Sequence, residues 1–200
     1  MATIYIAYGS VEGQTAHIAE YIADVIRAHG HQAVTADLKH SADTIPDGQD
    51  GVIVAASVHV GKHEGFVADF VRRNRGDLDR LPSALVSVSL AAHGDEAGAE
   101  SYVATFEEET GWHPAHVALF GGALLYTQYN FLKRQLMKKI VKDKGSQDLD
   151  TSRDYIYTEW DGVKHFTEEF LSGVTAPAGQ GQGTGTTSTE VPGSSPGFNP

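Results

Sequence analysis

A loop of small and hydroxyl-bearing residues near the N-terminus has the composition of an anion-binding turn. It lies between an apolar segment, residues 3–8, and an amphipathic segment, residues 15–29. If the first segment is a strand and the second a helix, the loop's backbone N–H groups and the helix N-terminus converge on one point that binds a phosphate well. The loop consists of Gly9, Ser10, Val11, Glu12, Gly13, Gln14 and Thr15.

This loop lacks the residues of two common phosphate-binding motifs, which limits the kind of phosphate that it can bind. The P-loop of nucleotide-hydrolysing proteins places Lys-Ser/Thr after its last glycine, whereas Gln14 follows Gly13 here. A dinucleotide-binding turn requires Gly-x-Gly-x-x-Gly, and position 11 is Val. Hydroxyl donors from Ser10 and Thr15 without a cation suit a buried phosphate monoester. We therefore expect FMN, with Glu12 turned outward.

Two further loops follow apolar runs and are expected beside the first. Residues 57–63 contain a glycine and are long enough to fold over a planar ring, and residues 89–95 are small enough to present backbone amides. One phosphate loop and two ring-flanking loops make an FMN site. The expected ring contacts are Ser57, Val58, His59, Val60 and Gly61, together with Ser89, Leu90, Ala91, Ala92 and His93.

Two of the ten histidines, His59 and His93, are among the expected ring contacts. His59 and His93 are therefore the candidate catalytic residues, because an imidazole beside a flavin can take a proton during substrate oxidation. Flavin hydride transfer also proceeds without a protein base, so that alternative stays open. The remaining histidine pairs have no third ligand at metal-binding spacing, and no metal is expected. No Ser-His-Asp or paired-carboxylate pattern indicates a hydrolase.

Apolar strands alternate with amphipathic helices along the chain. This pattern predicts an α/β fold, a doubly wound three-layer sandwich with a five-stranded parallel sheet of order 2-1-3-4-5. In such a sheet, ligands bind outside the carboxyl ends of the strands beside the first strand, where the three loops fall. The expected strands are residues 3–8, 32–38, 51–56, 84–90 and 116–120. The expected helices are residues 15–29, 63–75, 96–110, 130–142 and 158–171.

Composition excludes several classes of protein. The 200 residues are 40% hydrophobic, enough for one domain with its own core, and the absence of cysteine excludes disulfides and thiol chemistry. A formal net charge of −11 argues against a nucleic-acid partner, although acidity is also typical of proteins from high salt. No run approaches the roughly 18 apolar residues of a membrane span, and no signal-peptide pattern precedes the first strand. We expect a cytoplasmic protein.

Residues 131–144 are basic in an otherwise acidic chain. Six cations face Asp143 alone, which gives this segment +5 and the rest of the chain −16. As an amphipathic helix the segment has two interpretations. In the first, the helix lies on an anionic lipid surface at the inner face of the cell membrane. In the second, its apolar face covers the sheet and its polar face is in solvent.

The last part of the chain has a different composition. Residues 175–200 are rich in glycine, serine, threonine and proline and contain no apolar run. Such a segment cannot offset its conformational entropy by packing, and we expect it to be disordered. The folded domain is therefore predicted to comprise residues 1–174.

Several segments together resemble one branch of the flavodoxin-like superfamily, the menaquinone-dependent protoporphyrinogen IX dehydrogenases. The most specific match is Asp150-Thr151 followed by Tyr157-Thr158-Glu159-Trp160, since simple flavodoxins lack it. The others are Gly13-Gln14-Thr15, Ala56-Ser57, Leu81-Pro82-Ser83-Ala84, Ser87-Val88-Ser89-Leu90, Trp112-His113-Pro114 and Gly122-Ala123-Leu124. The family also inserts a loop and a basic helix after the fifth strand, which matches residues 125–144.

The resemblance implies an FMN enzyme that oxidises protoporphyrinogen IX to protoporphyrin IX in heme biosynthesis, with a membrane quinone as electron acceptor. A tetrapyrrole with two propionates calls for a cationic clamp. Residues 125–130 carry no cation, so the expected substrate contacts are Tyr126, Tyr129, Lys133 and Arg134.

Two other functions stay open. A flavodoxin-type electron carrier without a substrate of its own would use the acidic surface for docking, although it has no need of an inserted loop. A quinone reductase fed by NAD(P)H has no nucleotide fingerprint to support it. The sequence leaves the oligomeric state open.

Overall fold

The computed structural model describes residues 1–41, 43–143 and 150–175. Within the helix at 131–143 it describes the side chains of residues 134, 135, 137–139, 141 and 142.

Five parallel strands form the main sheet. They are β1 (Thr3–Gly9), β2 (Gln32–Asp37), β3 (Gly51–His59), β5 (Ser83–Ser89) and β6 (His116–Gly121). Their order is β2-β1-β3-β5-β6, which confirms the predicted arrangement because β5 and β6 are the fourth and fifth predicted strands. The pairs Gly9–Ala56, Ser57–Val88 and Ser89–Gly121 lie opposite one another in the sheet. The carboxyl ends of the four strands β1, β3, β5 and β6 are therefore level.

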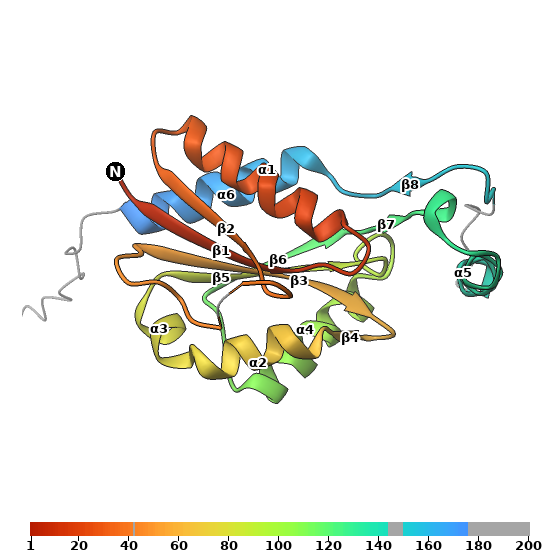
Figure 1. The fold of residues 1–200 in the computed structure, drawn as a ribbon, viewed down its shortest axis with the longest axis horizontal. Helices are drawn as coiled ribbons and strands as arrows, with labels where there is room; N and C mark the ends of the chain where they lie inside the picture. The colour runs from red at the N-terminus through yellow and green to blue at the C-terminus, as the bar shows by residue number, and fades with distance from the viewer. Residues whose placement is uncertain (42, 144–149, 176–200) are drawn as a thin grey trace, which may run out of the picture.

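Helices cover both faces of the sheet (Figure 1). One face carries α1 (Gln14–Ala28) and α6 (Trp160–Thr175), and the other carries α2 (Gly65–Arg73), α3 (Arg75–Arg80) and α4 (Glu96–Thr110). Alternate residues of each strand feed two separate cores, one containing Ile6 and Phe170 and the other containing Val54 and Phe70. The central strands are buried on both faces, which explains their nearly unbroken apolar sequence.

The predicted loop at residues 57–63 is instead a β-hairpin. Strand β3 continues to His59 and pairs antiparallel with β4 (Lys62–His63), whereas the predicted strand ends at residue 56. Contact of this segment with the flavin ring stays a prediction. The two turn residues, Val60 and Gly61, have φ values of 49° and 78°. Positive φ at both central residues is the geometry of a type I′ turn, which matches the twist of the strands. Val60 is a β-branched residue in this conformation, and the apolar run before it gave no sign of the turn.

The predicted helix at residues 63–75 is α2, and a short helix that was not predicted, α3, follows it after Asn74. The Asn74 side chain donates to the carbonyl oxygen of Phe70 at 2.8 Å and accepts from the backbone N–H of Ile45 at 2.9 Å. A buried amide with these backbone partners competes with continuation of the helix.

A second, smaller unit projects beyond the carboxyl ends of the strands (Figure 1). We call residues 122–157 the insert. It contains β7 (Ala123–Leu124), a 3-10 turn (Tyr126–Gln128), α5 (Phe131–Asp143) and β8 (Tyr155–Ile156). Strands β7 and β8 pair antiparallel, so the insert leaves and rejoins the domain at one place. The predicted basic helix is α5, whereas β7 and β8 were not predicted. Helix α6 ends at Thr175, and the predicted tail beyond it lies outside the described residues.

Candidate functional site

The loop between β1 and α1 has the geometry of an anion-binding turn. Gly13 adopts the left-handed conformation, with φ at 95°, and its N–H donates to Ser10 Oγ at 2.9 Å. No described side chain caps α1, so the N–H groups of its first turn face the loop without a side-chain acceptor. The Thr15 side chain is buried in that turn. The main-chain donors and the helix dipole therefore point at the place where the sequence predicts a phosphate.

A cation that the sequence analysis missed stands beside this loop. Lys39, just after β2, donates from Nζ to the carbonyl oxygen of Ser10 and lies over the Phe66 ring. The prediction considered only residues within the loop. The parallel pairing of β1 with β2 brings Lys39 to the same edge of the sheet.

Glu12 faces the insert, so the expectation that it turns outward was wrong. The Tyr129 hydroxyl donates to Glu12 Oε2 at 2.5 Å, and Glu12 Oε1 lies 3.9 Å from His59 Nε2. Burial, together with the Glu12 carboxylate, raises the pKa of Tyr129 above its usual value. Because Tyr129 is distant in sequence, the local residues gave no sign of this contact. Glu12 thus joins the phosphate loop to the insert.

His59 lies between two carboxylates. Its Nε2 faces Glu12, and its Nδ1 is 4.0 Å from Glu64 Oε1 at the start of α2. Ser57, two residues earlier, donates from Oγ to the carbonyl oxygen of Gly9 at 3.2 Å. These contacts hold the hairpin against the phosphate loop. An imidazole in this position is placed to accept a proton and pass it to a carboxylate.

The loop after β5 closes on itself and contacts the returning strand of the insert. Ser89 Oγ accepts from the N–H of Ala92 at 3.1 Å, and Gly94 has φ at 94°. The His93 ring stacks on Tyr157, with centroids 4.4 Å apart and 24° between the planes. A hollow of about 470 Å³ is lined by Ala92, Gly94, Glu96 and Leu119. The structure therefore brings all three predicted loops to one edge of the sheet.

Comparisons with known proteins agree with this architecture. A family model described as a flavodoxin domain matches residues 5–150. Protoporphyrinogen IX dehydrogenase [quinone] of Escherichia coli K12 is 31% identical over 167 residues, which cover 82% of this chain and 92% of that protein. The chain belongs to the protoporphyrinogen IX dehydrogenase branch of the flavodoxin family.

Two further matches are consistent with that assignment. Protoporphyrinogen IX dehydrogenase [quinone] of Leishmania major is 28% identical over 169 residues, covering 82% of this chain and 73% of that protein. The crystal structure of flavodoxin 1 from Bacillus cereus superposes with a TM-score of 0.50 at 15% identity, over 86% of this chain and 98% of that one, which supports the fold alone. The predicted fold, family and class of enzyme, an oxidoreductase, are confirmed.

A flavodoxin-family protein binds a flavin, and the residues at this edge suit one that carries a phosphate. The uncapped helix N-terminus, the left-handed Gly13 and the nearby Lys39 supply donors and positive charge. Gly9 is equally suited to its place, because a Cβ there would lie 2.3 Å from Val67 Cγ2. Only glycine lets β1 end this close to α2.

We expect the double substitution of Ser10 and Thr15 by alanine to weaken FMN binding about tenfold. It removes two hydroxyls from the phosphate loop, each worth roughly 0.5–1.5 kcal/mol as a net hydrogen bond. Flavin fluorescence titration with FMN and with riboflavin measures the effect. Riboflavin, which lacks the phosphate, should lose much less affinity. Equal losses for both ligands would contradict the assignment of the loop to the phosphate.

Gln14, another predicted cofactor contact, is engaged by the protein itself. Its Nε2 donates to Thr158 Oγ1 at 2.8 Å, and Thr158 in turn donates to the carbonyl oxygen of Gly121 at 2.7 Å. This buried chain joins the start of α1 to the end of β6 and to the point where the insert returns. Thr158 was missed as a site residue, although it lies in the Tyr157-Thr158-Glu159-Trp160 segment that indicated the family.

The predicted substrate contacts lie within the insert and brace it. Tyr126 is fully buried, and Tyr129 is buried against it. Arg134 donates from Nε to the carbonyl oxygen of Tyr126 at 3.0 Å and from Nη2 to that of Tyr129 at 3.1 Å. The side chain of Lys133 lies outside the described residues. Contact of these four residues with substrate stays a prediction.

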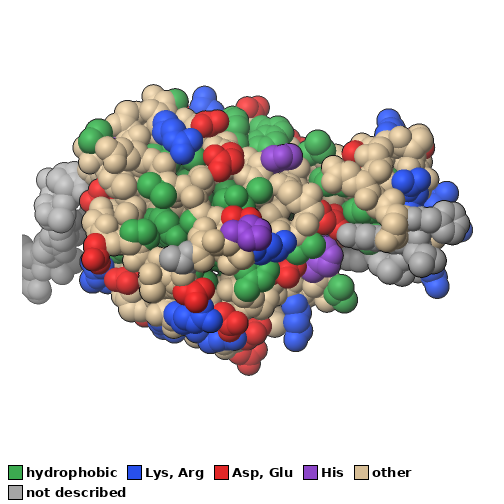
Figure 2. All heavy atoms as spheres, viewed as in Figure 1, with side chains coloured by type: hydrophobic (Ala, Val, Ile, Leu, Met, Phe, Trp, Pro, Cys, Tyr) green, Lys and Arg blue, Asp and Glu red, His purple; other side chains and the backbone are tan. Residues whose placement is uncertain are grey.

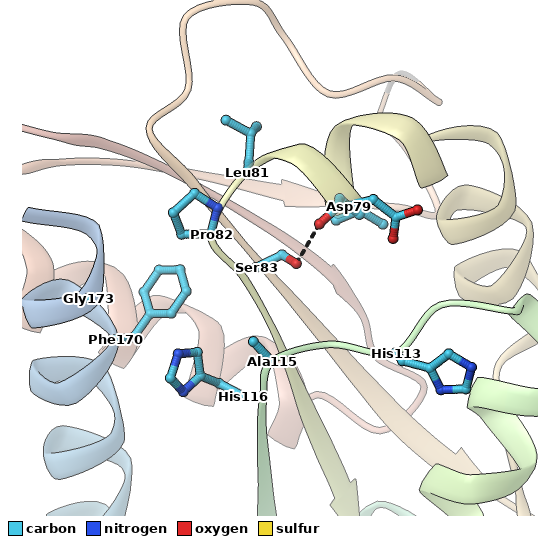
Figure 3. Close-up of a pocket in the computed structure, with 10 residues that line it drawn as sticks. Asp79, Leu81, Pro82, Ser83, His113, Ala115, His116, Phe170 and Gly173 are labelled. Carbon is cyan, nitrogen blue, oxygen red and sulfur yellow. Dashed lines mark hydrogen bonds between the residues drawn. The ribbon is translucent and has the colours of Figure 1, made fainter. Parts of the chain in front are cut away.

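A separate cavity of about 340 Å³ lies at the opposite, amino end of β5 and β6 (Figure 3). Two of its polar side chains have partners within the protein. Ser83 Oγ donates to the carbonyl oxygen of Leu78 at 2.7 Å, and His113, turned away from His116 in Figure 3, lies 3.2 Å from a Glu107 oxygen. In an open α/β sheet, ligands bind at the carboxyl ends, so this cavity is not our candidate site.

In the part of the chain that the structure describes, no cluster of histidine and acidic side chains is suited to a metal ion. No helix in that part of the chain is long and apolar enough to cross a bilayer.

Proposed function

We propose that this protein is an FMN-dependent dehydrogenase that oxidises protoporphyrinogen IX to protoporphyrin IX and passes the electrons to a quinone. The observation that carries this proposal is the insert fastened over the phosphate loop. Tyr129 of the insert contacts Glu12, and Thr158, the residue directly after the insert, contacts Gln14. A protein that only exchanges electrons has no need of a second unit beside its flavin. The named Escherichia coli relative, matched over most of its length, supports the same function.

FMN held at this edge of the sheet would supply the redox chemistry that couples oxidation of the porphyrinogen to reduction of the quinone. Each oxidation step removes two electrons and two protons from the macrocycle, and the quinone that gains both becomes a quinol. The chain's own residues bind the phosphate through the β1–α1 loop and flank the ring with the hairpin and the Ser89–Asp95 loop. His59, between Glu12 and Glu64, is the proposed acceptor of a substrate proton, and His93 is the second candidate.

The quinone partner is proposed to reach the site from a membrane surface. Lys138, Lys139 and Lys142 of α5 are exposed, and Figure 2 shows Lys and Arg side chains around the projecting insert. Each cation near an anionic bilayer contributes roughly 1 kcal/mol to attachment. Val141, in contrast, is buried in the insert's own core together with Tyr126. We propose a cytoplasmic protein that attaches peripherally to the inner face of the membrane through α5.

The test is oxidation of protoporphyrinogen IX by the FMN-loaded protein with menaquinone incorporated in lipid vesicles. We expect porphyrin fluorescence to rise well above the autoxidation rate, and faster with anionic than with neutral vesicles at low salt. High salt should remove the difference between the vesicles, because it screens the lysines. Porphyrin formation at the autoxidation rate in every mixture would contradict the proposed activity.

An electron carrier is the second candidate function, and the acidic chain favours it. The formal net charge is −11, and an acidic face suits docking to basic redox partners. The same assay separates the two functions. A carrier would pass electrons from its reduced flavin to cytochrome c and leave the porphyrinogen unchanged.

A further inference from the structure

A turn directly after β2 brings Lys39 to the edge of the sheet where the phosphate loop lies. Asp37, the last residue of β2, holds this turn. Its Oδ1 accepts the N–H of Lys39 at 2.9 Å, and its carbonyl oxygen accepts the N–H of His40 at 2.9 Å. The N–H of Leu38 donates to the carbonyl oxygen of Tyr8 in β1, also at 2.9 Å. The backbone of Lys39 is therefore fixed beside the end of β1.

The Lys39 ammonium contacts the phosphate loop and has no acidic partner among the described residues. Its Nζ donates to the carbonyl oxygen of Ser10 and lies 5.9 Å from the centroid of the Phe66 ring. In the same part of the chain, every arginine outside the insert has an ion pair with Asp or Glu; these are Arg27, Arg72, Arg73, Arg75 and Arg80. The positive charge of Lys39, in contrast, is not neutralised by an ion pair.

The contact with Lys39 orients the backbone N–H of Val11. A trans peptide bond is planar, so the carbonyl oxygen of Ser10 and the N–H of Val11 point in opposite directions. Because Lys39 holds the oxygen, the Val11 N–H points away from the ammonium, and no acceptor in the described residues takes it. The loop thus presents a main-chain donor that has a fixed direction and no partner.

The phosphate loop also needs a positive charge from outside itself. Glu12 is the only charged residue between Gly9 and Thr15, and its carboxylate repels a phosphate dianion held nearby. The N-terminus of α1 offers only a partial charge, about half of an elementary charge. Lys39 brings a full positive charge into contact with this loop.

We propose that Lys39 is a positioning residue for the flavin phosphate. It fixes the peptide between Ser10 and Val11 so that the Val11 N–H is available to a phosphate oxygen, and its charge offsets that of Glu12. This inference rests on the proposed function and deepens it by naming the residue that makes the site prefer a phosphorylated flavin to riboflavin.

The test is fluorescence titration of the flavin-free full-length protein with FMN and with riboflavin, at low and at high salt. Lys39→Met keeps a long apolar side chain beside Phe66 but removes the donor and the charge. It should weaken FMN binding about five- to tenfold at low salt, and riboflavin binding by less than about twofold. High salt should weaken FMN binding to the wild type more than to Lys39→Met, because it screens the ammonium.

Two further variants serve as controls. Lys39→Arg restores a donor and a positive charge, and should bind FMN within about twofold of the wild type. Arg80→Met removes one exposed positive charge from α3, which precedes the amino end of β5, and should change the affinity for neither flavin. Unchanged melting temperatures confirm that each variant is folded.

The outcomes separate this inference from the proposed function. Equal losses for both flavins in Lys39→Met would show that Lys39 only supports the fold, and an unchanged FMN affinity would show that it does not act on the phosphate. Either result overturns the inference, as does a wild type that binds FMN no better than riboflavin or binds neither. If the FMN-specific loss appears but the wild type leaves porphyrinogen unoxidised, the inference holds and only the proposed activity falls.

Discussion

Replacing Gly121 by alanine should lower the free energy of unfolding by about 2–3 kcal/mol, near the upper end for overpacking. A Cβ at this position would lie 2.4 Å from the carbonyl oxygen of Tyr157 and 2.8 Å from its carbonyl carbon. These are backbone atoms, which cannot rotate away as a side chain can. The carbonyl oxygen of Gly121 also accepts the Thr158 hydroxyl, so any shift of the strand disturbs the chain of hydrogen bonds to Gln14.

The neighbouring glycine supplies a matched control. A Cβ at Gly122 would meet its first neighbour, the carbonyl carbon of Ser89, at 3.6 Å, which is ordinary van der Waals contact. Gly122→Ala should therefore change stability by less than about 0.5 kcal/mol, as for an unstrained substitution. Urea denaturation of the two variants beside the wild type measures the difference. Equal stability of both variants would show that the crossing of Tyr157 over β6 is not closely packed.

The second large effect is a loss of stability in mild acid that depends on His63. This histidine is 8% exposed, its Nε2 lies 2.9 Å from Ser87 Oγ, and its ring packs 4.7 Å from that of Phe106. Burial lowers the pKa of His63 from 6.5 to about 4. Between these values the unfolded chain binds a proton that the folded protein excludes.

The sign of the effect follows from this difference in protonation. Above pH 6.5, protonation of His63 does not lower the free energy of unfolding, because the imidazole is neutral in the folded and the unfolded chain. The free energy of unfolding falls as the pH drops from 6.5 toward 4, where the folded protein also takes up the proton. At 1.36 kcal/mol per pKa unit, the shift lowers the free energy of unfolding by about 3 kcal/mol in total. His63→Gln should flatten this part of the stability profile, whatever its constant effect on stability.

Urea denaturation at several pH values from 7 down to about 4 tests this linkage. Carboxylates titrate in the same range, so the informative quantity is the difference between the wild type and the variant. His165→Gln is the control, because that side chain is 74% exposed. Parallel profiles for the wild type and His63→Gln would show that the buried imidazole does not cause the acid sensitivity.

The strands and their order could be predicted because each carries its own local signal. The runs that became β3 and β5 are apolar on both faces, as only a covered parallel strand requires, and the helices between them have one apolar side. The turn at Val60 had no such signal. Its left-handed conformation is imposed by the pairing of β3 with β4, and propensity disfavours a β-branched residue there.

The positions of the site loops were predictable, but the contacts between them were not. Spacing and glycines located the phosphate loop and the loop containing His93. The partners of Glu12 and Gln14 come from Tyr129 and Thr158, more than a hundred residues away in sequence. Such contacts depend on how the insert folds back, which no local pattern encodes. Motif resemblance at residues 157–160 marked the right segment without giving its geometry.

The antiparallel pairing of β7 with β8 has a consequence for how this branch can diversify. The insert enters and leaves the domain at neighbouring points, since the N–H of Tyr157 donates to the carbonyl oxygen of Gly122 at 3.0 Å. A segment with adjoining ends behaves as a closed loop, for which each doubling of length costs only about 0.6 kcal/mol of closure entropy. The length and composition of the insert can therefore change between relatives while the sheet and its cofactor edge remain stable.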